Sequence, residues 1–486
     1  MIELTVYAGI THFDGNRIEL QSMCKALKLP NPNGYWIARK FLQKHAYLYH
    51  DKEQVAKIEE RYAWIRFYDW RRRTFLSGLL TRATNYLDKQ EIKYKVEDKR
   101  RKLENLPPIK KLNIPGEQRA EQIIAVNAAL KYQRGILALA TNAGKTNCAA
   151  AIIQELLYQK PNRSVLFLVH RIGLAKQTKD RFVELLGGPI WMLGAGNRTI
   201  PAHGILVSTI QTMHNCLANR RAETLGFLEK CDAVFVDELH INKAYLVTDV
   251  MSQCSAPMRI GLSGTISRQN KIKYMHYRGL CGPILAETSN KELVEKGRSA
   301  KPIIRFIKIT EPEIGGSYGE AYRNGIVLHE RRNRAILNET RRYLEQDKRV
   351  LVFVSRKAHG YRLMDSFKRA FDIPCDFILG NTGLYQREEI TRRFVQNKLP
   401  ILIVSPVSDV GWDLPEIEAA IFAGGGRGWE ICLQRLGRTL RKKKGENRTW
   451  ITDFLDYHNS YLRKHSKLRL KYYRQEQIAQ IKIVGK

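Results

Sequence analysis

The sequence predicts an α/β protein with two tandem doubly wound domains, each built on a parallel sheet, preceded by a small α+β domain. From Asn113 to about Glu295, near-continuous apolar strands alternate with amphipathic helices, and the same alternation returns from Pro302 to Asp453. Apolar strands between helices are typical of buried parallel sheets. The length of 486 residues also exceeds what one hydrophobic core usually organises.

These patterns divide the chain into four parts. We expect an N-terminal accessory domain over residues 1–105, a first α/β domain over 113–297, a second over 300–458, and a basic C-terminal tail over 459–486. A charged stretch over 97–104, followed by Asn105-Leu106-Pro107-Pro108, has the composition of a linker.

The N-terminal part combines short strands with helical patterns. Its clearest helix covers Gly78–Lys89, where Leu79, Leu80, Ala83, Tyr86 and Leu87 share one face. The expected strands are Ile2–Ala8, Arg17–Leu20, Tyr47–His50, Trp64–Trp70 and Lys93–Glu97.

The two α/β domains have longer and more apolar strands. In the first domain we expect Ile136–Ala140, Ser164–Val169, Gly204–Ser208, Ala233–Val236 and Arg259–Leu262. In the second we expect Ile303–Ile309, Val350–Val354, Ile401–Val404, Ala419–Ala423 and Thr449–Asp453.

The charge balance indicates a polyanionic partner. Lys and Arg number 82 against 48 Asp and Glu, which gives a net charge of +34. Nucleic acid is the commonest partner of so basic a chain, and a generally basic soluble surface is the alternative.

The cysteines and the hydropathy pattern indicate an intracellular protein. The eight cysteines are scattered and form no C-x-x-C pair, which argues against a zinc ribbon or a disulfide framework. No apolar run approaches the ~20 residues that span a bilayer, and the N-terminus lacks a signal-peptide pattern. We therefore expect a soluble cytoplasmic protein that does not bind membranes.

The segment Leu139–Thr146 predicts a phosphate-binding loop. It follows an apolar strand, ends in Gly-Lys-Thr and precedes a helix expected through Leu157. Such a loop offers backbone N–H groups and a helix N-terminus to phosphates. Lys145 would neutralise the β- and γ-phosphates, and Thr146 would hold Mg²⁺. Leu139 stands where the common motif has glycine, so the loop alone does not decide between nucleotide binding and a plain helix start.

An acidic pair follows the Ala233–Val236 strand and could supply the carboxylates that bind a metal ion and activate water. In an α/β domain with a phosphate loop, Asp237 would hold the metal and Glu238 would polarise the attacking water. An ordinary acidic turn is the alternative explanation of Asp237-Glu238.

Together these segments resemble the superfamily 2 DExH helicases and translocases, over about Asn113–Asp453. The resemblance rests on motifs in the family's order: Arg119-x-x-Gln122, Val169-His170-Arg171 with Leu174 and Gln177, Val207-Ser208-Thr209 with Gln211-Thr212, Asp237-Glu238-Leu239-His240, Ser263-Gly264-Thr265, Val350–Ser355, Gly411-Trp412-Asp413-Leu414-Pro415, and Gln434-x-x-Gly437-Arg438-x-x-Arg441.

The resemblance implies two RecA-like domains, an ATP hydrolase that uses Mg²⁺, and named residue roles. The catalytic residues are Lys145, Glu238, Gln434, Arg438 and Arg441, and the metal residues are Thr146 and Asp237. The nucleotide residues are Arg119, Gln122, Thr141, Asn142, Ala143, Gly144, Lys145, Thr146, Gly411 and Asp413. The DNA-backbone candidates are Arg171, Ser208, Thr209 and Ser355, although strand-end capping explains the hydroxyl residues equally well.

The N-terminal part is similar to that of the phage UvsW-type helicases. The similarity lies in Trp64–Asp69 and in the F-x-x-G-L-L pattern of Phe75–Leu80, followed by a final strand. It implies a monomeric bacteriophage translocase in the host cytoplasm, active on branched duplex DNA. Forks and Holliday junctions would be its substrates, in recombination, repair or replication restart.

Two further basic segments are candidate DNA contacts. Arg71, Arg72 and Arg73 would lie at a hairpin tip and touch duplex backbone, with a solvated turn as the alternative. The tail would contact phosphates and bases, or it would form a terminal helix packed through Leu470 and Tyr472.

Proteins with other functions are alternatives, and several of them contain the same ATP-hydrolysing domains. A conventional 3′–5′ unwinding DNA helicase and a DExH RNA helicase remain open. The motor subunit of a nuclease is disfavoured because no nuclease motif is recognised. A structural DNA-binding protein is disfavoured by the intact Lys145, Glu238 and Arg438.

Overall fold

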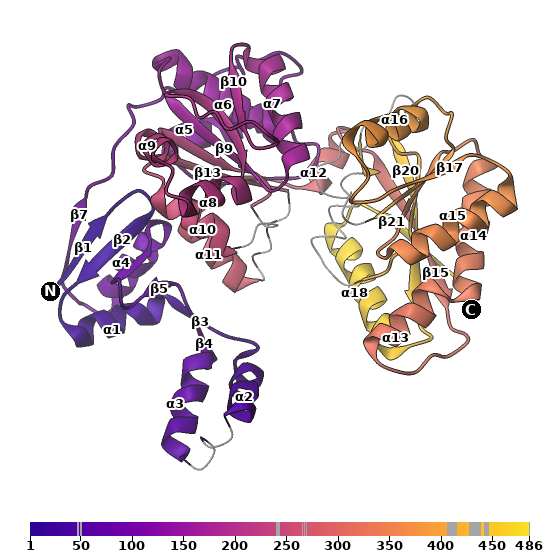
Figure 1. The fold of residues 1–486 in the computed structure, drawn as a ribbon, viewed down its shortest axis with the longest axis horizontal. Coiled ribbons are helices and arrows are strands. Elements are labelled where there is room, and N and C mark those ends of the chain that lie inside the picture. The colour runs from indigo at the N-terminus through magenta and orange to yellow at the C-terminus, as the bar shows by residue number, and fades with distance from the viewer. Residues whose placement is uncertain are drawn as a thin grey trace. The chain divides into compact units, whose positions relative to one another are not determined.

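The computed structural model of the protein describes residues 1–45, 48, 51–239, 244–264, 266, 268, 270–405, 416–426, 439–441 and 447–485. The chain divides into two compact units (Figure 1). One contains Met1–Ala138 and Lys145–Glu287, and the other contains Leu139–Gly144 and Thr288–Lys486.

The N-terminal domain is a mixed sheet covered by helices α1 and α4. The strand order is β5-β6-β2-β1-β7, in which β1 and β7 are parallel and the other neighbouring strands are antiparallel. Its elements are β1 (Ile2–Val6), β2 (Ile10–Asp14), α1 (Arg17–Ala26), β3 (Lys28–Pro30), α2 (Gly34–Lys44), α3 (Lys52–Ala63), β4 (Trp64–Arg66), β5 (Tyr68–Asp69), β6 (Thr74–Leu76), the 3₁₀-helix η2 (Ser77–Leu79), α4 (Leu80–Lys89) and β7 (Tyr94–Asp98).

Two strand predictions in this domain were wrong. Arg17–Leu20 begins a helix, because the Asn16 side chain caps the N–H of Ile18 and the buried residues Leu20, Met23 and Cys24 follow helical spacing. Trp64–Trp70 is two strands rather than one, since β4 pairs with β3 and β5 pairs with β6. Tyr47, Tyr49 and His50 of the expected strand Tyr47–His50 lie outside the described residues.

Helices α2 and α3 form a separate helical pair that is joined to the N-terminal domain by the ribbon of β3 and β4 (Figure 1). The two helices pack on each other, and α3 has no buried residue. This pair is therefore an appendage of the domain rather than part of its core.

The first α/β domain has a seven-stranded sheet in the order β10-β11-β9-β12-β13-β8-β14, with parallel pairing from β10 through β8. Its elements are α5 (Ala120–Tyr132), β8 (Arg134–Leu139), α6 (Lys145–Gln159), β9 (Ser164–Val169), α7 (Ile172–Leu186), β10 (Ile190–Leu193), β11 (Gly204–Thr209), α8 (Ile210–Ala218), α9 (Ala222–Lys230), β12 (Ala233–Val236), α10 (Ala244–Gln253), β13 (Met258–Ser263), α11 (Lys271–Cys281) and β14 (Ile284–Thr288).

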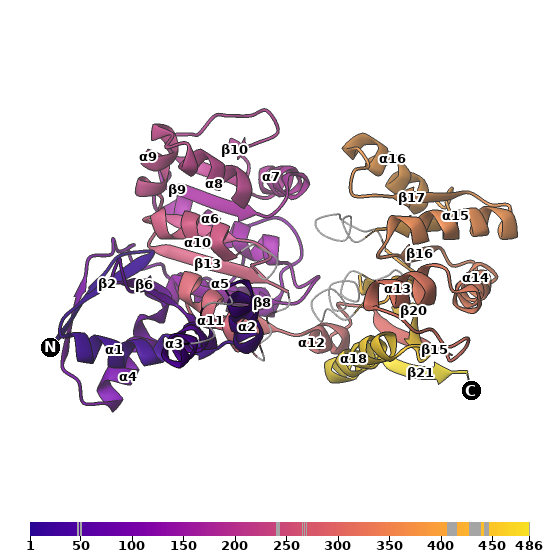
Figure 2. The same cartoon turned by 60° about the horizontal axis from the view of Figure 1, so that its bottom comes forward.

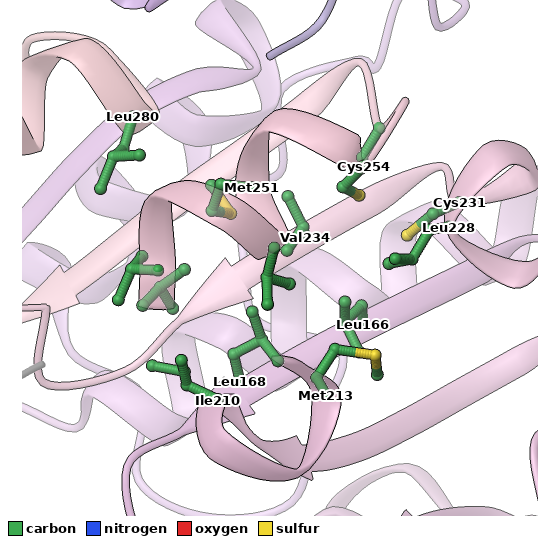
Figure 3. Close-up of a cluster of buried hydrophobic side chains, with 14 of the residues drawn as sticks. Leu166, Leu168, Ile210, Met213, Leu228, Cys231, Val234, Met251, Cys254 and Leu280 are labelled. Carbon is green, nitrogen blue, oxygen red and sulfur yellow. The ribbon is translucent and has the colours of Figure 1, made fainter. Parts of the chain in front are cut away.

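Alternate side chains of the same strands build two cores in this domain. Leu166 and Leu168 of β9 pack with Ile210 and Met213 of α8 and with Met251 of α10 (Figure 3). On the opposite face, Phe167 of β9 meets Phe182 of α7, with ring centroids 5.0 Å apart. The sheet is therefore covered on both sides, which confirms the doubly wound prediction.

The second α/β domain repeats this plan with the order β17-β18-β16-β19-β20-β15-β21, in which all neighbouring strands are parallel. Its elements are α12 (Asn290–Glu295), β15 (Lys301–Ile309), α13 (Tyr318–Tyr322), the π-helix η3 (Arg323–Val327), α14 (Glu330–Leu344), β16 (Val350–Phe353), α15 (Lys357–Phe371), β17 (Cys375–Ile378), α16 (Leu384–Val395), β18 (Ile401–Val404), β19 (Ala419–Phe422), β20 (Arg448–Asp456), α18 (Ser460–Glu476) and β21 (Gln480–Val484).

Residues 459–485 are part of this second domain rather than a detached tail. Leu470 and Tyr473 of α18 are buried in the core that α16 also covers, and β21 pairs with β15 in parallel. Figure 2 shows α18 and β21 side by side at one edge of the domain. The helix is the alternative that the sequence left open for this basic segment, and the edge strand β21 was not predicted.

The structure bears on two further expectations, the state of the cysteines and the presence of membrane-spanning helices. The seven cysteines in the described part of the chain are free and buried. Among the described residues, we find no helix with the length and apolar character needed to cross a membrane.

The N-terminal domain packs on the first α/β domain through close backbone contact. A Cβ atom on Gly78 of η2 would lie 2.0 Å from the carbonyl oxygen of Arg278 in α11. Nearby, the Arg134 guanidinium donates to the carbonyl of Ala8 at 2.8 Å. Gly78 is therefore required by the approach of two backbones, and the accessory domain is held to α11 without a spacer.

We predict that Gly78→Ala destabilises the protein by about 1–3 kcal/mol, because the added methyl group overpacks a backbone contact that cannot yield. Gly226→Ala in α9 is the control, since no heavy atom lies within 4 Å of its added Cβ. This control should be neutral or should gain up to about 1 kcal/mol of helix propensity. Chemical denaturation of both variants measures the difference, and equal stabilities would contradict the proposed contact.

Candidate functional site

The loop between β8 and α6 has the backbone geometry of a phosphate cradle. Asn142 and Gly144 adopt positive φ angles of 73° and 83°, and the Ala143 N–H donates to the Ala140 carbonyl at 3.1 Å. The turn delivers the chain into α6 at Lys145, and the first turn of α6 has no acidic residue. Its free N–H groups and helix dipole therefore favour an anion at this point.

The acidic pair lies at the carboxyl end of β12, in the same sheet. The Asp237 N–H donates to the Leu168 carbonyl at 2.8 Å, and the Glu238 N–H donates to the Asp237 Oδ1 at 2.9 Å. Glu238 has a φ of 44°, an uncommon conformation for a residue with a side chain. This turn holds the Glu238 carboxylate at the strand end.

Lys145 and Glu238 meet although they lie in different βα units. The Lys145 Nζ and the Glu238 Oε1 are 3.7 Å apart, and both side chains are mostly buried. The structure thus brings together the cation of the phosphate loop and the carboxylate of the DExH motif.

The Asp237 carboxyl is buried beside the Glu238 carboxylate. Its pKa is raised to about 7, mainly by burial and also by the neighbouring Glu238 carboxylate, while Lys145 opposes the shift. A divalent cation beside Asp237 would favour the ionised form. The Asp237 carboxylate and the Thr146 hydroxyl are hard oxygen donors of the kind that Mg²⁺ prefers. No cluster of three or more His, Cys, Asp or Glu occurs among the described residues.

The candidate adenine residues begin α5. Arg119 is the N-cap residue and pairs with Glu117 at 3.3 Å, while Gln122 is buried. Sequence reasoning missed the role of Gln118, whose amide donates to the Leu112 carbonyl at 2.6 Å and accepts from the Leu112 N–H at 2.7 Å. Gln118 therefore anchors the segment that leads into α5.

Two of the DNA-backbone candidates serve the fold. Ser208 is fully buried and donates to the Thr209 carbonyl at 3.2 Å. The Thr209 hydroxyl accepts from the Thr212 N–H at 3.0 Å and caps α8. Capping is the alternative that the sequence left open, and these contacts favour it because neither hydroxyl faces solvent.

The other two backbone candidates are more accessible. Arg171 is the half-buried residue that precedes α7, and Ser355 is a half-buried residue just beyond the carboxyl end of β16. Both positions are strand ends, as expected for residues that contact a ligand at the edge of a parallel sheet.

The cationic hairpin tip lies where it was expected. Arg71–Arg73 connect β5 to β6, and Asp69 accepts hydrogen bonds from the N–H groups of Arg71 and Arg72. All three arginines are exposed, but Arg73 pairs with Asp14 of β2. Arg72 lies only 3.8 Å from Asp69 of its own turn, a looser pair than that of Arg73, so Arg71 and Arg72 are better placed than Arg73 to contact a ligand.

Of the five candidates from the last two motifs, only Arg441 is described. Its backbone bridges to Ser299, the adjacent Leu440 carbonyl accepts from the Ala300 N–H at 2.8 Å, and burial lowers the pKa of the guanidinium. Gly411, Asp413, Gln434 and Arg438 lie outside the described residues, as do Thr265 and His240 of the family motifs.

Two family models match the α/β domains in order. Residues 115–268 match the model described as type III restriction enzyme, res subunit, and residues 333–443 match the helicase conserved C-terminal domain.

Individual relatives agree with these matches. The chain is 28% identical over 371 residues to the DNA 3′–5′ translocase XPB2 of Sulfurisphaera tokodaii, covering 68% of this chain and 80% of the relative. It is 24% identical over 382 residues to the ATP-dependent DNA helicase uvsW of Enterobacteria phage T4, covering 72% and 74%.

A solved structure supports the fold. The helicase MrfA bound to DNA aligns with a TM-score of 0.57 at 14% identity, over 75% of this chain and 52% of that protein. At this identity the likeness concerns the two-domain architecture alone.

The matched models, the motif order and the relatives agree with the tandem RecA-like sheets. The chain therefore has the two helicase domains of the superfamily 2 DNA helicases and translocases, and it resembles the phage UvsW-type helicases.

Proposed function

We propose that this protein is a monomeric ATP-driven translocase that migrates branches in Holliday junctions and forks, in recombination, repair or replication restart. One observation carries the choice of branched DNA. The accessory domain is held backbone to backbone against α11 of the first motor domain at Gly78, and it presents a cationic hairpin tip. A DNA contact made by Arg71 and Arg72 would therefore move together with the ATP-binding domain.

The ATP site works through the pair that Lys145 and Glu238 form. The Lys145 Nζ lies 3.7 Å from the Glu238 carboxylate. Bound phosphates would compete for the lysine charge and leave Glu238 to polarise the attacking water. Mg²⁺, held by Thr146 and Asp237, would neutralise the phosphate oxygens.

The remaining nucleotide residues complete the proposal. Gln122 and Arg119 would recognise the base, and Thr141–Gly144 would cradle the phosphates through their backbone. Gln434, Arg438 and Arg441, with Gly411 and Asp413, would act from the second domain when the motor closes on ATP. An arginine supplied in this way stabilises the charge that develops on the γ-phosphoryl group.

Removal of either partner of the ion pair tests the ATP site. We predict that Lys145→Ala and Glu238→Gln each lower the DNA-stimulated ATPase rate at least about 100-fold. Glu238→Gln should retain nucleotide binding, whereas Lys145→Ala should weaken it. Lys160→Ala, an exposed lysine after α6, is the control and should keep the wild-type rate. Normal hydrolysis by Glu238→Gln would reject the assigned role.

Substrate preference tests branch migration. We predict that the protein with ATP and Mg²⁺ processes Holliday junctions and forks much faster than a plain partial duplex of the same length. Gel assays of the three substrates measure this, and RNA duplexes test the DExH RNA helicase alternative. Faster unwinding of the plain partial duplex would instead identify a conventional unwinding helicase.

Salt dependence tests the hairpin tip. We predict that Arg71→Gln/Arg72→Gln lowers the slope of log affinity for a junction against log salt by about 1.8, because each lost phosphate contact contributes about 0.9. Arg73→Gln is the matched control, since this guanidinium is engaged by Asp14 and should leave the slope nearly unchanged. An unaltered slope in the double variant would show that the tip does not contact DNA.

A further inference from the structure

Helix α18 separates its side chains into two faces of opposite character. The inward face buries Leu462, His465, Ser466, Arg469, Leu470 and Tyr473. The outward face carries the exposed cations Arg463, Lys464, Lys467, Lys471 and Arg474. The helix contains one acid, Glu476, which accepts from the Asn290 amide at 3.1 Å and has a pKa raised mainly by burial. All exposed charges of α18 are therefore positive.

A groove runs beside this cationic face. It has a volume of about 680 Å³, and its apolar floor includes Leu455, Leu470 and Ile483. Lys467, Lys471 and Arg474 stand on its rim, and no described residue that lines it is acidic. The groove therefore combines apolar lining residues with three cations, which favours an anionic ligand.

Three cations gather over one ring at the end of this groove. The Tyr457 centroid lies 5.3 Å from the Lys308 Nζ, 5.2 Å from the Arg463 Cζ and 5.5 Å from the Lys467 Nζ. Ring electrons attract cations, but they do not cancel the repulsion among three of them. Within the described part of the chain, Lys308, Lys467, Lys471 and Arg474 form no ion pair. A polyanion is the partner that this cluster lacks.

The spacing of the cations favours an extended polyanion over a small one. Arg463 and Arg474 are separated by roughly 17 Å of helix, at ~1.5 Å per residue. Phosphates of one DNA strand follow one another at ~3.4 Å along the duplex axis, so the row reaches several of them. The cations over Tyr457 cover its ring, which disfavours base stacking there and favours contact with the sugar-phosphate backbone.

The groove lies away from the backbone candidate of the same domain. Ser355 follows β16, and β21 is separated from β16 by three strands in the sheet order. Four strand spacings of ~4.8 Å place them roughly 19 Å apart across the sheet. A backbone contact at α18 is therefore a separate contact from one at Ser355.

We propose that the outward face of α18, with the groove beside β21, binds the sugar-phosphate backbone of a second duplex arm of a branched DNA. This inference rests on the proposed function, and it assigns to the second domain a site that holds an arm other than the one being translocated. Binding there is independent of sequence, because point charges on phosphates read no base edges.

The test replaces the three cations that line the groove with uncharged glutamine and compares the binding of two DNA substrates. Lys467→Gln/Lys471→Gln/Arg474→Gln should lower junction affinity about tenfold and lower the salt slope by about 2.7, at about 0.9 per phosphate contact. Affinity for a plain duplex and the ATPase rate on saturating plain duplex should stay at wild-type values. Arg362→Gln/Lys368→Gln/Arg369→Gln is the matched control, because it removes the same charge from exposed positions of α15.

A charge-preserving variant separates charge from folding. Lys467→Arg/Lys471→Arg/Arg474→Lys should bind junctions like the wild type. Unchanged junction affinity in the neutral variant would overturn the proposal, and so would an equal loss on plain duplex, which would place α18 on the translocated arm. The substrate preference of the wild type is measured before any variant is compared. A wild type that shows no preference for branched DNA would contradict the proposed function itself.

Discussion

The parallel order of the strands is the constraint on which the rest of the molecule depends. In a parallel sheet every strand ends at the same edge, so residues that follow different strands meet there. Lys145 follows β8 and Glu238 follows β12, with only β13 between these strands in the sheet. Their ion pair of 3.7 Å joins residues far apart in the chain, and neither residue would reach the other if β8 or β12 ran in the opposite direction.

The second domain relies on a buried ionic network at the equivalent edge. Arg332 of α14 pairs with Asp456 at 2.9 Å, and Arg469 of α18 pairs with Asp453 at 3.0 Å. Both arginines also donate to backbone carbonyls that follow β19, those of Ala423 and Gly426. Loss of one partner in such a pair costs about 3–5 kcal/mol, because it leaves a buried charge unpaired. The network therefore ties helices from the two faces of the sheet to the loop after β19.

The sequence predicted the strands of both α/β domains well because burial on two faces demands continuous apolar runs. Ser164–Val169, Ala233–Val236 and Ile401–Val404 have the expected bounds. Strands at or near the sheet edges escaped prediction, since β21 (Gln480–Val484) alternates polar and apolar residues as one face meets solvent. Arg17–Leu20 was misassigned because the Asn16 cap outweighs a short apolar pattern.

The residues of the candidate site were also predictable only where the local sequence pattern determines their position. Lys145, Asp237 and Glu238 were identifiable because their spacing after apolar strands is specific. The hydroxyls of Ser208 and Thr209 were not assignable, because their partners depend on where α8 begins. The pairing of Arg73 with Asp14 was equally hidden, since it follows from how β2 and β6 pair in the folded sheet.

Position in a helix, rather than composition, decides what each cation of α18 does. Arg469 is buried and has its charge matched by Asp453, so it stabilises the attachment of the helix to the sheet. Lys467 and Lys471, two residues away on either side, turn to the opposite face and lie on the groove rim. A helix advances ~100° per residue, so a run of basic residues is divided between structure and surface by its periodicity alone. The excess of positive charge in this chain is therefore informative only where the fold leaves a cation without an acidic partner.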